Sequence, residues 1–120
     1  MPRTALTAIA VKGPHPGTVS ANDLDFSFTA CDVGNKNKFT LTGRQLILVQ
    51  NVNVGAKTVT FTSVNDPYSR PGTITTYRLG ASEFAAFWAG DLTGWQQTDG
   101  EFYLEGEHVD IKFAIITIPG

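Results

Sequence analysis

Apolar and polar residues alternate along several stretches of this chain with the period of a β-strand. The clearest runs cover residues 24–28, 58–62 and 109–115. Successive side chains on a strand point to opposite faces of its sheet, so each run predicts one buried face and one face in contact with water.

Turn-forming residues divide these runs at intervals of about ten residues, the spacing of a sandwich or barrel. Glycine, proline and asparagine cluster at 13–17, 34–37 and 51–55, and a longer loop at 65–72 contains two prolines. We therefore expect an all-β protein, an antiparallel β-sandwich or jelly-roll-like barrel of about eight short strands.

Two local features bear on this fold. Asp99-Gly100 predicts a two-residue type I′ turn between Trp95–Gln97 and the strand that begins near Phe102, because this pair tolerates positive φ angles. The segment 82–90 fits a short helix capped by Ser82 or a strand, and its β neighbours favour a strand.

Leu46–Val49 and Ala114–Ile118 are apolar on both faces rather than on one. Such a strand is either central and covered within its own chain, or it presents its second face to another subunit. A sandwich of this size has little chain with which to cover an outer face, so we expect contact with another subunit. The predicted oligomer interface consists of Leu46, Leu48, Ala114, Ile116 and Ile118.

The length of 120 residues and the hydrophobic content of 42% indicate one compact domain. Within it we expect residues 1–22 to form an N-terminal strand or extended arm and residues 23–120 to form the β-sandwich. No stretch approaches the ~20 consecutive apolar residues that a membrane-spanning helix needs, and the start of the chain is typical of a first strand. We expect no membrane partner.

The formal charge of -2, with nine scattered lysines and arginines, argues against a dedicated nucleic-acid-binding protein. Such proteins gain much of their affinity from a basic face that neutralises phosphates. The single cysteine, Cys31, cannot form an internal disulfide, and its apolar neighbours predict a buried thiol.

No catalytic signature is evident, so we expect a protein that is not an enzyme. The only histidines are His15, between two prolines, and His108, next to Glu107. No Gly-x-Ser-x-Gly motif surrounds a serine. A Cys-His pair that forms only in the folded chain, using Cys31, stays open as an alternative.

We expect no metal and no cofactor. Glu101, Glu105 and Glu107 share a strand parity, and the simplest interpretation is a solvated acidic edge that discourages sheet-to-sheet aggregation. Calcium binding by these three carboxylates is the alternative.

Aromatic side chains are the remaining candidates for a binding site. Trp88, Trp95 and Tyr103 could form a ligand platform on which a sugar ring stacks. The alternative is that most of them lie in the core, because each buries a large apolar area.

Residues 39–118 resemble the small β-sandwich structural proteins of tailed bacteriophages. The segments that carry the resemblance are Phe39–Arg44, Leu46–Asn51, Thr58–Ser63, Ala81–Glu83, Asp99–Gly100 and Ile111–Ile115. The turn at Ala81–Glu83 has Ser82 where that family has glycine.

The resemblance implies a capsid decoration or auxiliary head protein that binds the major capsid protein in the virion as a homo-oligomer, usually a trimer. It carries over no catalytic residue. A carbohydrate- or protein-binding β-sandwich module, such as a tail or surface adhesion component that uses Trp88, Trp95 and Tyr103, is the alternative function.

Overall fold

The computed structural model describes residues 3–11, 25–64, 68 and 72–118, and these residues form strands and loops with no helix. The expected all-β sandwich is therefore confirmed. The ten strands within the described residues are β1 (Thr4–Ala5), β2 (Ile9–Ala10), β3 (Thr29–Ala30), β4 (Asn37–Thr40), β5 (Gln45–Asn51), β6 (Lys57–Thr62), β7 (Ile74–Leu79), β8 (Phe84–Ala89), β9 (Glu101–Gly106) and β10 (Ile111–Thr117).

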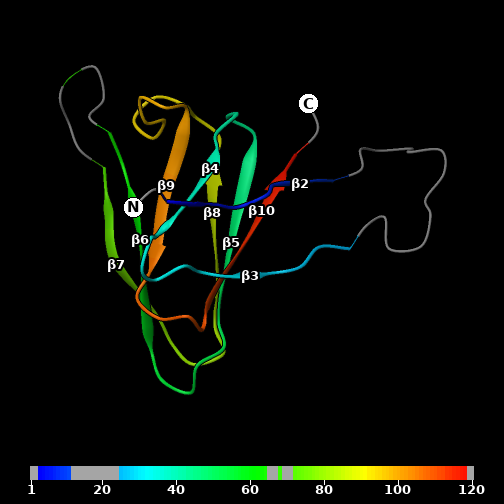
Figure 1. The fold of residues 1–120 in the computed structure, drawn as a ribbon, viewed down its shortest axis with the longest axis vertical. Helices are drawn as coiled ribbons and strands as arrows, with labels where there is room; N and C mark the ends of the chain where they lie inside the picture. Colours follow the sequence, from blue (N-terminus) through cyan, green and yellow to red (C-terminus); the bar gives the residue numbers. More distant parts are fainter. Residues whose placement is uncertain (1–2, 12–24, 65–67, 69–71, 119–120) are drawn as a thin grey trace.

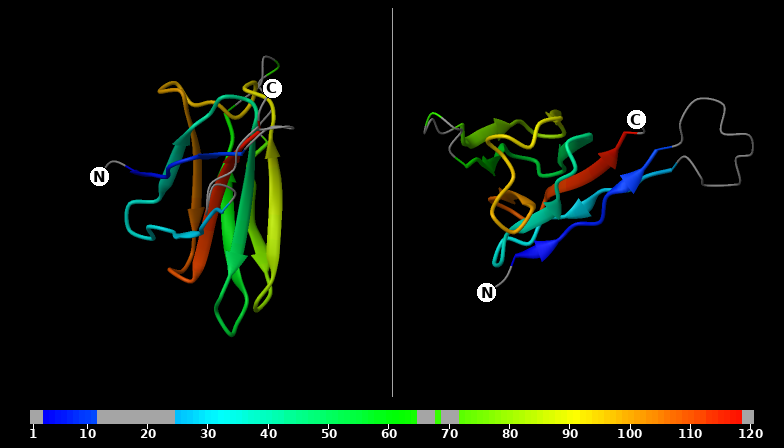
Figure 2. Two further views of the ribbon diagram at one scale, coloured as in Figure 1. Left: turned by 90° about the vertical axis from the view of Figure 1, so that its right-hand side faces the viewer. Right: turned by 90° about the horizontal axis from the view of Figure 1, so that it is seen from above.

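The strands form two sheets (Figures 1 and 2). Sheet A has the order β1-β4-β9-β6-β7, and sheet B has the order β2-β10-β5-β8, with β3 also paired to β10. Both sheets are mixed rather than purely antiparallel, because β1 runs parallel to β4 and β2 runs parallel to β10.

The core lies between the sheets and follows the predicted alternation in two of the three runs. On β6, Val59 and Phe61 are buried between threonines that are half-buried. On β10, every residue from Phe113 to Ile116 is buried. The run at 24–28 differs, since its described residues 25–28 form no strand and Phe26 is exposed.

The N-terminal segment joins both sheets through its described residues. β1 pairs with β4 in sheet A and β2 pairs with β10 in sheet B, while the side chain of Leu6 between them enters the core. A free arm thus cannot include residues 3–11. The rest of the expected arm, residues 1–2 and 12–22, lies outside the described residues.

The expected turn at Asp99-Gly100 has a different geometry. The Gly100 N–H donates to the Gln97 carbonyl (2.9 Å) and the Gln97 N–H donates to the Glu101 carbonyl (2.8 Å), which closes a three-residue loop. Gly100 has φ 83°, whereas Asp99 is not among the residues with positive φ. This pattern is a turn followed by a glycine bulge, so the type I′ prediction is wrong. The stretch Trp95–Gln97 is also loop rather than strand.

The segment 82–90 contains strand β8, as its β neighbours suggested. Ser82 does not cap a helix; it has φ 62° in a tight turn, within which the Gly80 N–H donates to Glu83 Oε1 (2.6 Å).

Asp32 ties β1 to the turn before β4. Its carboxylate accepts hydrogen bonds from the Thr4 hydroxyl and from the backbone N–H of Asn35 (3.1 Å). The hydrogen bond from Thr4, followed by those from Asn35, lowers the pKa of Asp32. A carboxyl group whose pKa is lower in the folded chain contributes stability above its unfolded pKa of about 3.9 and loses it as the pH falls through the folded value.

We expect Asp32→Ala to unfold at a lower temperature than the wild type at pH 7, and the difference to shrink as the pH falls below about 4. Differential scanning calorimetry between neutral and acid pH measures this. An equal difference in unfolding temperature between variant and wild type at pH 7 and at acid pH would show that the Asp32 contacts do not depend on its charge.

Gly106 at the end of β9 permits close packing of the core beneath it. A Cβ atom there would lie 2.8 Å from Cγ2 of Ile111 and 2.9 Å from Sγ of Cys31. Neither neighbour has room to move, because both side chains are buried.

We expect Gly106→Ala to lower the free energy of unfolding by about 1–3 kcal/mol, the usual cost of overpacking a core. Urea denaturation followed by tryptophan fluorescence measures it. Gly34→Ala is the control, because the nearest atom to its new Cβ is 3.8 Å away in a surface turn. A similar loss in both variants would exclude overpacking as the cause.

Candidate functional site

The outer faces of the two sheets differ in chemistry. The outer face of sheet A is polar and carries two ion pairs among its described residues. Lys36 Nζ lies 3.0 Å from Glu105 Oε2, and Lys38 Nζ lies 4.0 Å from Glu101 Oε1. Tyr103, on the same face, receives the Arg3 guanidinium 4.2 Å above its ring. This face resembles an ordinary surface in water.

The outer face of sheet B is apolar. Strand register places Trp88, Leu46, Ile116 and Ile9 in one row across four strands. A second row contains Ala86, Leu48 and Ala114. Gln50 and Lys112 stand in the next row, beside Phe84.

Aromatic rings extend these rows. Phe28 lies 6.2 Å from Phe84 between ring centroids, and Phe26 lies 5.8 Å from Phe28. Phe84, Trp88 and Phe26 are 65%, 56% and 47% exposed. We call this surface the apolar face, which consists of Ile9, Phe26, Phe28, Leu46, Leu48, Phe84, Ala86, Trp88, Ala114, Ile116 and Ile118.

Gly90 allows the Trp88 indole to lie close to the chain. A Cβ atom on Gly90 would fall 1.9 Å from Nε1 of Trp88, so the ring occupies the space that a side chain would take. The indole therefore adds to the apolar face rather than projecting freely into water.

The five predicted interface residues all belong to the apolar face, with different exposure. Leu46, Leu48 and Ile118 are half-buried, whereas Ala114 and Ile116 are buried within the single chain. The latter two can contribute little direct contact area to another subunit.

The sequence prediction missed Phe84, Phe28, Phe26 and Ile9 on this surface. Phe84 shares the parity of Trp88 within β8, so the alternation of that strand contained the signal. Phe26 and Phe28 belong to the run 24–28, whose alternation predicted a strand that its described residues do not form, and Ile9 comes from a segment without a clear strand pattern.

The three residues of the predicted ligand platform do not lie together. Trp88 is on the apolar face and Tyr103 is on the outer face of sheet A. Trp95 packs between the sheets, where its ring stacks on Phe102 (5.5 Å) and meets Phe87 edge-on (5.1 Å). A single platform of these three residues is not formed.

A Cys31–His108 pair is also not formed, and His15, the other histidine, lies outside the described residues. The Cys31 thiol donates to the backbone carbonyl of His108 (3.0 Å) rather than approaching its imidazole. The His108 ring lies near Asp110, with Nδ1 3.6 Å from Oδ2. Burial raises the pKa of Cys31, which keeps it a thiol and a poor nucleophile.

The three glutamates considered for calcium have separate partners. Glu101 and Glu105 face the lysines described above, and Glu107 Oε1 accepts the Thr58 N–H (3.0 Å). Within the described ranges, no group of three or more His, Cys, Asp or Glu side chains is placed to hold a metal ion.

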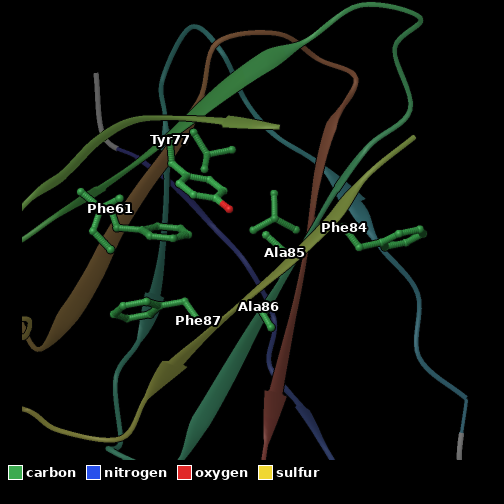
Figure 3. A pocket seen from close by; sticks show the side chains of 9 residues that line it. Phe61, Tyr77, Phe84, Ala85, Ala86 and Phe87 are labelled. Carbon is green, nitrogen blue, oxygen red and sulfur yellow. The ribbon is translucent and has the colours of Figure 1, made fainter. Parts of the chain in front are cut away.

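A pocket opens between the two sheets on the side where β7 and β8 are the edge strands (Figure 3). Its volume is about 250 Å³, and every lining residue except Tyr77 is wholly apolar. The lining residues are Val49, Val59, Phe61, Ile74, Tyr77, Phe84, Ala85, Ala86 and Phe87.

A β-bulge shapes this pocket. Phe61 pairs with Ile74 and Val59 pairs with Tyr77, so β7 has one residue more than β6 between these pairs. Thr76 in the bulge has φ 50°, a conformation that is strained for a β-branched residue. The extra residue places Ile74 rather than Thr75 opposite Phe61 on the inner side. Tyr77 faces inward opposite Val59, and its ring points into the pocket in Figure 3.

No helix in the part of the chain that the structure describes is long and apolar enough to span a membrane.

The two tryptophans provide a test of these placements. For the single chain, diluted until it sediments as a monomer, we expect Trp95→Phe, which retains Trp88, to show red-shifted emission and strong acrylamide quenching. Trp88→Phe, which retains Trp95, should show bluer emission and several-fold weaker quenching under the same conditions. Stern–Volmer analysis of the two single-tryptophan variants measures this. Equal quenching would contradict the burial of Trp95 between the sheets.

Comparisons with known proteins identify no relative: no family model, no curated protein and no solved structure matches this chain. The evidence on function therefore comes from the surfaces described above.

Proposed function

We propose that this chain is a non-enzymatic structural protein that self-associates through the apolar face. The observation that carries the proposal is the contrast between the two outer faces of one sandwich. Sheet A covers its outer surface with charges and hydrogen bonds, whereas sheet B presents rows of tryptophan, phenylalanine, leucine and isoleucine.

The size of the exposed apolar area supports an interface. An aromatic side chain has a surface of about 150–250 Å², so the three half-exposed rings leave roughly 300 Å² uncovered. The half-buried Ile9, Leu46, Leu48 and Ile118 add to this. A patch of that size is comparable with the largest patch on a typical monomer, about 300–600 Å², and such patches are often functional. A standard interface buries about 800 Å² per partner.

The biological role that we propose is that of a capsid decoration protein of a tailed bacteriophage, assembled as a trimer on the major capsid protein. Its support is the resemblance of residues 39–118 to that class of structural protein, together with a β framework that offers no arrangement for catalysis among its described residues. We propose the virion as its location, with no nucleic acid, membrane or cofactor as partner.

The sugar-binding alternative is not carried forward. It needs Trp88, Trp95 and Tyr103 on one surface, and the fold directs them to the apolar face, the interior and the outer face of sheet A.

Self-association is tested by Trp88→Lys, with Thr62→Lys as the matched control. Trp88 ends the first row of the apolar face and is 56% exposed, whereas Thr62 is half-buried on the outer side of sheet A. We expect the wild type and Thr62→Lys to sediment as oligomers at micromolar concentration. Trp88→Lys should dissociate with a constant at least tenfold higher, since tryptophan is prominent among the residues that dominate interface energies. Sedimentation velocity measures both.

A wild type that is monomeric at tens of micromolar, the upper range for a stable assembly, would overturn self-association. The virion role has a separate test: the gene is expected next to a major capsid gene, and the protein to co-sediment with capsids made from that gene. An oligomer that does not bind those capsids would retain self-association and overturn the decoration role.

A further inference from the structure

Strand β8 is an open edge of sheet B among the described residues. The Asn51 N–H donates to the Glu83 carbonyl (3.0 Å), and this bond determines which residues of β8 direct their backbone groups toward β5. In an antiparallel pair, alternate residues bond to the partner strand, so the backbone N–H and C=O groups of Phe84, Ala86 and Trp88 point away from β5. A row of unpaired backbone groups is a template for one more strand.

The pocket lies directly beside this edge. Ala85 and Phe87 line it from the inner face of β8, and Ala86 and Phe84 lie at its rim (Figure 3). Its volume of about 250 Å³ exceeds the ~150 Å³ of a cavity that takes up benzene. It therefore has room for one large apolar side chain.

The strained bulge points to a use for the pocket. Without the extra residue, Thr75 would lie opposite Phe61, and its polar side chain would take the place of Ile74 in the pocket wall. Tyr77 brings an apolar ring to the pocket wall, and its hydroxyl has no hydrogen-bond partner among the described residues. Strain held at a bulge is common beside binding sites, where it redirects a side chain.

A second copy of β8 does not fit this site. In an antiparallel β8–β8 pair, the inward side chains that could enter the neighbour's pocket are Ala85, Phe87 and Ala89. The alanines are too small to fill it. Phe87 is held in its own core by Phe61 (5.2 Å) and Trp95 (5.1 Å), so it cannot leave.

We propose that the β8 edge binds an extended segment of another protein as an additional strand, and that one large aliphatic or aromatic side chain of this segment occupies the pocket between β7 and β8. Backbone hydrogen bonds to Phe84, Ala86 and Trp88 provide affinity, and the pocket provides selectivity for the side chain. The side chains of Phe84, Ala86 and Trp88 belong to the apolar face, but this site uses their backbone groups and needs no second copy of the chain.

The probe is a panel of synthetic peptides, acetyl-Lys-Thr-Thr-Xaa-Thr-Thr-Lys-amide, in which Xaa is Leu, Phe, Ala or Asp. Length and charge are the same across the Leu, Phe and Ala peptides, and the pocket-filling variant Ala85→Leu separates the contribution of the pocket from that of strand propensity. We expect the Leu and Phe peptides to shift the amide resonances of β8 in nitrogen–proton NMR spectra. Their dissociation constants should be at least tenfold lower than that of the Ala peptide, and the Asp peptide should not bind.

Two variants separate the edge from the pocket. Ala86→Pro removes an N–H that the β5–β8 ladder does not use, and it should abolish binding of every peptide, whereas the control Ala86→Val, which keeps the N–H, should bind. Ala85→Leu fills the pocket from within, and it should reduce binding of the Leu peptide to the level of the Ala peptide. NMR spectra of each free variant show whether it folds. If Ala86→Pro does not fold, Ala85→Leu still tests whether the pocket takes up the peptide's central side chain.

Three results would overturn the proposal. The first is equal affinity for the Leu and Ala peptides in the wild type. The second is undiminished binding to a folded Ala86→Pro variant. The third is a shift of β8 amides with protein concentration in the Trp88→Lys variant that Ala86→Pro removes, because the edge would then serve a second copy independently of the apolar face. Peptide binding by a monomeric Trp88→Lys variant would support this site even if self-association through the apolar face fails.

Discussion

Phe102 lies at the centre of the interior, and its ring contacts hold the two sheets together. It is fully buried on β9, and its ring centroid lies within 6.0 Å of those of four other aromatic residues. Phe39 and Phe61 come from sheet A, Phe87 comes from sheet B, and Trp95 comes from the loop before β9. A single ring thus links both layers and one of the loops that join them.

This cluster determines which aromatic residues remain for function. Trp95 and Phe87 are committed to the interior, so neither is free to stack on a ligand or to enter a neighbouring molecule. Trp88 and Phe84, which alternate with Phe87 along β8, are directed outward by the same geometry. The apolar face is therefore a consequence of the core: an aromatic strand that buries one side must expose the other.

Much of this arrangement could be predicted from the sequence. The alternation identified the inward residues of β6 and β10, and the doubly apolar stretch at Leu46–Val49 indicated an uncovered face. Such predictions succeed where a strand is long enough for its period to show.

Other features have no local signal. The two-residue strands β1 and β2 are specified by their partners rather than by a pattern of their own, so the parallel pairings could not be expected. Thr76 has no intrinsic tendency toward positive φ, and its bulge arises from the pairing of β7 with β6. The position of Trp95 depends on its packing against Phe102. The turn motif between these two residues carries no signal for that contact.

The edge strands of the two sheets differ in their protection against pairing with another chain. Edge strands of soluble proteins are usually protected by charges, prolines or bulges that prevent pairing with another chain. β7 has a bulge and Arg78, and β1 covers β4 at the other end of sheet A. β8, with the sequence Phe-Ala-Ala-Phe-Trp-Ala, has no charge, no proline and no bulge in its pairing with β5. An edge left without such protection beside an apolar pocket is what a strand-binding site requires, and the aromatic core that holds the two sheets together keeps both in place.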